Sequence, residues 1–130
     1  MNINKKNKYG TTPLHTACIN CNTHMVELLL THPNIKVNEI NKQGIMPLAY
    51  ACYHNSINIV SMLLRYPGID INRSNTMTPL HLTTNGQNIG IVNLLLFISS
   101  LILMLTRWMK MVEHLWIKNV LHMYYILFWL

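Results

Sequence analysis

The chain has few charged residues and very few acidic ones. Only 11% of its 130 residues are charged, with four acidic against ten basic side chains, so the formal net charge is +6. Because no pair of carboxylates has a spacing suited to acid–base catalysis, the sequence predicts no enzyme and no small-molecule substrate. The basic residues are scattered except for Lys5, Lys6 and Lys8, so nucleic acid is not predicted as a partner either.

Cysteine is scarce as well, with three in the chain. The basic, polar start does not resemble a secretory signal, so we expect free thiols and an intracellular, cytoplasmic location. Cys18 and Cys21 form a C-x-x-C pair, which in other proteins binds zinc or exchanges disulfides. However, Cys52 follows an alanine just as Cys18 does, in a stretch that repeats the surroundings of Cys18, which indicates a small buried slot. We therefore predict no metal and no cofactor.

Three stretches of the chain repeat one another. They read GTTPLHTACINCNTHMVELLL (10–30), GIMPLAYACYHNSINIVSMLL (44–64) and TMTPLHLTTNGQNIGIVNLLL (76–96). Their prolines, Pro13, Pro47 and Pro79, recur at nearly equal intervals. A short internal period of this kind is typical of proteins built from stacked helical units.

Each stretch predicts two short helices. A Thr before the proline is a favourable N-cap, and proline suits the first helical position because its missing N–H needs no partner. A turn centred on Cys21, Asn55 or Gln87 leads to a second helix, whose apolar residues, Met25 and Leu28 among them, are predicted to face inward. Gly10 and Gly44 stand where a tight reversal needs a positive φ.

The segments TPLHTAC, MPLAYAC and TPLHLTT, each followed by a helix similar to IV-x-LLL, resemble ankyrin repeats over residues 2–96. The resemblance implies an all-α solenoid of helix–turn–helix units with β-hairpin-like finger loops, in repeats of about 8–40, 41–73 and 74–96. It also implies a non-catalytic protein–protein interaction module, in which His15 and His81 tie neighbouring repeats together. The third finger is shorter than the second and lacks its glycine, so we expect it to be distorted.

The resemblance further implies that another protein binds the finger tips and the exposed side of each first helix. Tyr9, Ile45 and Tyr53 are the strongest candidates, because exposed aromatic and aliphatic side chains often anchor interfaces. The full set of matching positions is Lys8, Tyr9, Thr11, Ile19, Asn20, Lys42, Gln43, Ile45, Tyr53, His54, Asn75, Thr76, Met77 and Asn85.

Residues 97–130 form an apolar, helical, non-ankyrin tail with neither proline nor glycine, and it contains all three Trp and both Phe of the chain. One interpretation is a membrane anchor, since residues 89–106 are uncharged and long enough to span a bilayer. A capping helix is a second interpretation, but a cap needs a polar outer face that this tail lacks. A third interpretation comes from the genetic code.

Read one frame over, the codons of the tail contain traces of a fourth repeat. Trp108–Met109 forces GAT (Asp), Met109–Lys110 forces GAA (Glu) and Met111–Val112 forces GGT (Gly). With the choices allowed around them, residues 108–116 can encode D-E-D-G-G-T-P-L, and residues 100–106 permit P-D-I-D-V-N. The tail is thus interpreted as an out-of-frame fourth repeat, and the chain as a fragment or frameshifted remnant of a longer ankyrin protein. The opening NIN, similar to the end of a preceding link, agrees with this interpretation.

Overall fold

The computed structural model describes residues 2–76, 78–85 and 89–129, without the side chains of residues 84 and 85. The chain divides into two compact units, Met1–Leu95 and Leu96–Leu130, and each is described here by itself. The predicted boundary between residues 96 and 97 stays a prediction.

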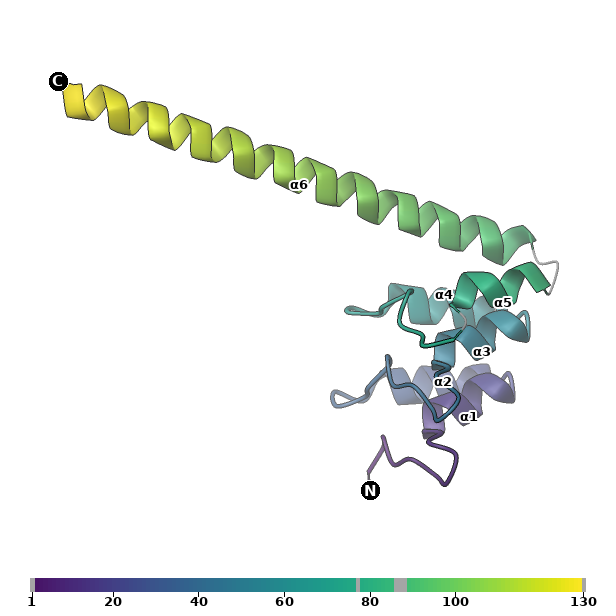
Figure 1. Ribbon diagram of the computed structural model, residues 1–130. Helices are drawn as coiled ribbons and strands as arrows, with labels where there is room; N and C mark the ends of the chain where they lie inside the picture. The colour runs from purple at the N-terminus through teal and green to yellow at the C-terminus, as the bar shows by residue number, and fades with distance from the viewer. Residues whose placement is uncertain (1, 77, 86–88, 130) are drawn as a thin grey trace. The chain divides into compact units, whose positions relative to one another are not determined.

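Three pairs of helices repeat along the first unit, which confirms the predicted all-α, helix–turn–helix architecture. The first helices, α1, α3 and α5, pack against one another in a row, and α2 packs on α4 behind them (Figure 1). The bounds are α1 Pro13–Ile19, α2 Thr23–Leu30, α3 Pro47–Tyr53, α4 Ile57–Arg65, α5 Pro79–Asn85 and α6 Ile89–Trp129.

Helix starts follow the sequence signals. Thr12 caps α1, because its hydroxyl accepts a hydrogen bond from the backbone N–H of His15 at 3.4 Å, and Pro13 follows as the first helical residue. At α3 the cap position holds Met46, whose fully buried side chain makes no cap hydrogen bond. Apolar burial therefore replaces the polar cap in the second repeat.

The predicted turn geometry is confirmed where the structure describes it. Gly10 and Gly44 have φ values of +76° and +75°, and the turns inside the first two repeats place Cys21 and Asn55 at φ +53° and +59°. Gln87, the third turn residue, lies outside the described residues. The finger loops consist of turns and bends, and none of the described residues is in a strand, so the predicted hairpin-like form of the fingers is not confirmed.

Each repeat contributes a small set of apolar side chains to a core that runs through the stack. Both rows of helices contribute fully buried side chains, such as Leu14, Leu48, Val26, Ile59 and Ile91.

One prediction about the second helices was wrong, because Met25 and Leu28 of α2 are 43% and 52% exposed. Their counterparts in α4, Ile59 and Met62, are buried and half-buried. In the described chain no repeat covers that side of α2, and a pattern that repeats in sequence does not reveal which copy lies at an end.

The second unit is the continuation of α6 as a single helix. Whereas α2 ends at Leu30 and α4 ends at Arg65, α6 continues to Trp129. The predicted apolar helical tail is therefore confirmed as a helix. Among the described residues of this unit there is no second element against which the helix could bury its apolar side chains.

Candidate protein-binding surface

Each of the first two fingers is shaped by one asparagine. In the first finger, the side-chain oxygen of Asn7 accepts hydrogen bonds from the backbone N–H groups of Tyr9 (2.9 Å) and Thr11 (3.0 Å). In the second, Asn41 holds Gln43 (2.9 Å) and Ile45 (3.0 Å) in the same way. Because the loop folds around this amide, the tip residues project away from the stack and stay exposed.

The two fingers are bonded to each other as well. The backbone N–H of Lys42 donates to the carbonyl of Tyr9 at 3.0 Å. The imidazole of His15 reaches the carbonyl of Ile45 from α1, with Nε2 3.0 Å from the oxygen. Two independent contacts therefore fix the second finger against the first repeat.

The protonation state of His15 follows from its partners. The backbone N–H of Thr12 donates to Nδ1 at 3.2 Å, so this nitrogen carries no proton and Nε2 is the donor to Ile45. Burial lowers the pKa of His15 below its usual 6.5, although the Ile45 carbonyl acts in the opposite direction. The ring is neutral at physiological pH and ties two repeats together, as the resemblance implied.

A groove of about 250 Å³ lies where the two fingers and α3 meet. The Tyr50 hydroxyl connects its walls, since it accepts a hydrogen bond from Asn41 Nδ2 (2.9 Å) and donates one to Gln43 Oε1 (3.2 Å). The residues that line the groove are Tyr9, Thr11, Asn41, Lys42, Gln43 and Tyr50.

Positive charge dominates the first two fingers. The ammonium group of Lys8 lies 4.9 Å from the ring centroid of Tyr9, and Lys42 lines the groove itself. Glu39, the only carboxylate that the structure describes in residues 5–12 and 39–46, forms an ion pair with Lys6. The hydrogen bond from Lys6 lowers the pKa of Glu39, which therefore stays charged and paired. The groove is left with cations that lack a carboxylate of their own.

Not all of the predicted contact residues come together. Tyr9, Thr11, Lys42 and Gln43 line the one groove. Ile19 and Asn20 lie at the end of α1, and Tyr53 and His54 at the end of α3, where their rings meet edge-on at 5.1 Å. Asn75 and Thr76 are exposed on the third finger, Ile45 is half-buried, and Met77 and the side chain of Asn85 lie outside the described residues.

Two groove residues were missed from the sequence. Asn41 occupies the same position in the second finger as Asn7 in the first, and each begins the pattern N-K-x-G. The structural role of Asn41 could therefore have been predicted from the sequence. Tyr50 had no such signal, because the corresponding residue of the first repeat is Thr16 and the repeat pattern does not reveal a contact that one copy alone makes.

The cysteines occupy structural positions. Cys18 and Cys52 are buried free thiols, and burial raises the pKa of each to about 12, whereas Cys21 is exposed and its sulfur accepts a hydrogen bond from Ser56 at 2.9 Å. Such buried thiols are protonated and unreactive at neutral pH.

Comparison with known proteins agrees with this geometry. The family model described as ankyrin repeats, three copies, matches residues 1–75 and again 38–102. The chain belongs to the ankyrin-repeat family. Members of this family are generally protein–protein interaction modules and are typically not catalytic. No curated protein matches the chain significantly.

The ankyrin chain has one further feature, the helix that begins within its third repeat and continues beyond it. Among the described residues, α6 is the one helix long and apolar enough to cross a membrane, by length and composition only.

Proposed function

We propose that this ankyrin array binds another protein through the groove between its first two fingers. The observation that carries the proposal is the groove itself, whose walls are fixed by hydrogen bonds from Asn41 and Tyr50 and whose rim carries Tyr9, 61% exposed. An exposed aromatic ring on a rigid loop provides contact area at a low entropic cost. Since no carboxylate among the described residues pairs with Lys8 or Lys42, the partner surface is acidic.

Three tyrosine variants of the full chain test where the partner binds. The partner is first identified by cross-linking in cells, then purified and titrated against each variant. Tyr9→Ser should weaken binding by about 2 kcal/mol or more, as is usual for an aromatic anchor. Tyr66→Ser is the matched control, because Tyr66 lies in the link that follows α4 and not in the groove. If Tyr53→Ser weakens binding and Tyr9→Ser does not, the contact surface lies at the helix ends instead.

Attachment to a membrane through α6 is a second candidate. An α-helix rises about 1.5 Å per residue, so the stretch 89–106 spans about 27 Å, close to the hydrocarbon core of a bilayer. This stretch is uncharged, and Arg107 and Lys110 follow it at the position of a membrane interface.

Flotation with lipid vesicles tests the anchor, because aggregates sink and membrane-bound protein floats. The full chain should float even after carbonate washing. Replacing Leu101 and Leu103 by lysine should abolish flotation, since two buried charges make insertion costly. The same replacements at the exposed array residues Asn20 and Asn58 are the control.

We also infer that the codons of residues 97–130 are read out of frame from a fourth ankyrin repeat. The forced Asp, Glu and Gly of the other frame support this origin, as does α6, which continues beyond the length at which α2 and α4 end. The nucleotide sequence from Val92 onward tests it directly. Codons that give Asp-Gly-x-Thr-Pro-Leu one frame over support the inference, and codons that spoil this motif contradict it and favour the membrane anchor.

A further inference from the structure

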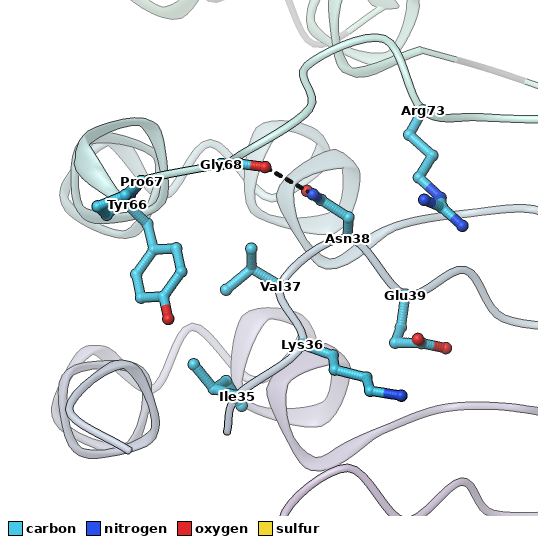
Figure 2. Close-up of a pocket in the computed structure, with 9 residues that line it drawn as sticks. All are labelled: Ile35, Lys36, Val37, Asn38, Glu39, Tyr66, Pro67, Gly68 and Arg73. Atoms are coloured by element: carbon cyan, nitrogen blue, oxygen red, sulfur yellow. Dashed lines mark hydrogen bonds between the residues drawn. The ribbon is translucent and has the colours of Figure 1, made fainter. Parts of the chain in front are cut away.

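Asparagine side chains hold the links between repeats. The side-chain amide of Asn4 donates from Nδ2 to the carbonyl of Asn34 (2.7 Å) and accepts at Oδ1 from the backbone N–H of Lys36 (2.9 Å). Asn38 repeats the arrangement one unit later, with the carbonyl of Gly68 at 2.7 Å and the N–H of Asp70 at 2.9 Å. We call each such pair of hydrogen bonds an asparagine clamp. Figure 2 shows the bond from Asn38 to Gly68.

The clamp binds a non-helical link, which leaves a turn at Asn34 or Gly68 and has neither helix nor turn over its next two residues. It binds a carbonyl and, two residues later, an N–H on the same side of the chain, which happens only when the chain is not helical. An extended link lets alternate side chains enter the stack, and Ile35 and Val37 are accordingly only 8% and 5% exposed. Successive links leave a hollow of about 310 Å³ between them, with Val37 on one side and Tyr66 on the other (Figure 2).

A third asparagine occupies the position equivalent to Asn4 and Asn38. Asn72 follows Asn38 at the same interval that separates Asn38 from Asn4. Its own backbone N–H is bonded to the Asp70 carboxylate at 3.0 Å, which fixes the loop that carries it. Its side chain is exposed, and its amide forms no hydrogen bond with the described residues.

The chain does not provide the link that a third clamp would hold. The corresponding stretch, residues 100–106, lies inside α6. Its backbone groups are engaged within the helix, and the Ile102 carbonyl also accepts a hydrogen bond from the hydroxyl of Thr106 at 2.7 Å. A helical segment cannot present the extended carbonyl and N–H pair that Asn4 and Asn38 bind.

We propose that the surface around Asn72 is a binding site for an extended peptide of the link type, Pro-x-Ile-x-Ile/Val-Asn, provided by a separate ankyrin repeat. This site continues the interface that already joins the repeats, and it is distinct from the groove between the first two fingers. The backbone of the bound peptide takes the two clamp hydrogen bonds. We expect its two branched side chains to be buried beside Ile71, as Ile35 and Val37 of an earlier link are buried in the stack.

A peptide titration tests the site in the full chain, kept in solution by an amphipol that covers α6. The probe is a blocked synthetic peptide with the sequence of residues 66–72, YPGIDIN. The side-chain amide resonances of Asn72 should shift and saturate as the peptide is added. Asn72→Ala should weaken binding about tenfold, because both clamp hydrogen bonds are lost.

Two controls distinguish binding at the clamp from nonspecific binding of the peptide. Asn75→Ala removes an equally exposed amide from the neighbouring finger and should leave the affinity unchanged. A peptide with both isoleucines replaced by aspartate should not bind. If the Asn72 resonances do not move at millimolar peptide, or if Asn72→Ala binds as well as the parent, there is no such site.

Discussion

Removal of the Asn38 side chain is the sharpest test of how this array is held together. Asn38→Ala deletes two hydrogen bonds between the second link and the third, to Gly68 and to Asp70. Asn72→Ala deletes the same amide from the equivalent position of the next link, where no described group is bonded to it. The pair therefore compares an occupied clamp with an empty one.

The two substitutions should change the free energy of unfolding by clearly different amounts. A hydrogen bond contributes about 1 kcal/mol net, so Asn38→Ala should lower the free energy of unfolding by about 2 kcal/mol. The orphaned groups of Gly68 and Asp70 lie on exposed residues and can bind water, which keeps the loss from being larger. Asn72→Ala should change the free energy by less than about 0.5 kcal/mol, as exposed substitutions usually do.

The assay has to report on the repeats without interference from α6. Cys18 and Cys52 are buried in the array, so their alkylation during short pulses at increasing urea measures its unfolding alone. In the Asn38→Ala variant both thiols should react at lower urea than in the parent. Equal midpoints for Asn38→Ala and Asn72→Ala would show that the clamp does not stabilise the stack, and would also remove the basis for a site at Asn72.

Three further outcomes follow from the geometry. In the folded chain, iodoacetamide should modify Cys21 first, by mass spectrometry, because it is exposed whereas burial raises the pKa of the other two thiols to about 12. Gly10→Ala should cost more stability in urea titrations than Gly68→Ala. Both have a positive φ and share a strain of about 1 kcal/mol, but a Cβ at Gly10 would also lie 2.9 Å from a backbone nitrogen and one at Gly68 would meet nothing. Because burial lowers the pKa of His15, the unfolded chain takes up the proton first, so its contribution to stability is complete above about pH 7 and falls as the pH drops below 6.5. His15→Gln should flatten this part of the pH profile.

The sequence was sufficient for the parts of the fold that depend on local geometry. Gly10 and Gly44 stand at positive φ as predicted, because few other residues tolerate that region. The helix starts at Pro13 and Pro47 were visible because proline suits the first helical position, where its missing N–H needs no partner. The regular recurrence of these signals then gave the stack, since neighbouring copies must bury each other's apolar faces.

Contacts between repeats were less visible from the sequence. Asn4, Asn38 and Asn72 recur at equal intervals, but this spacing does not reveal that the first two bind the backbone of the next link. Tyr50 closes the groove although its repeat partner is Thr16, so a repeat alignment points away from it. The exposure of Met25 likewise depends on its place at an end of the described stack, which periodicity does not encode.

The asparagine clamp has a consequence for how arrays of this kind are assembled. Its two bonds reach only a carbonyl and an amide N–H, which nearly every residue possesses, so the side chain at the N–H position can differ, as Lys36 and Asp70 do. The two hydrogen bonds of the clamp therefore depend little on which side chain follows the bonded N–H. The clamp bonds themselves need no matched side chain when a unit is added, removed or exchanged, and the partner contacts that we propose lie elsewhere, in the groove between the first two fingers.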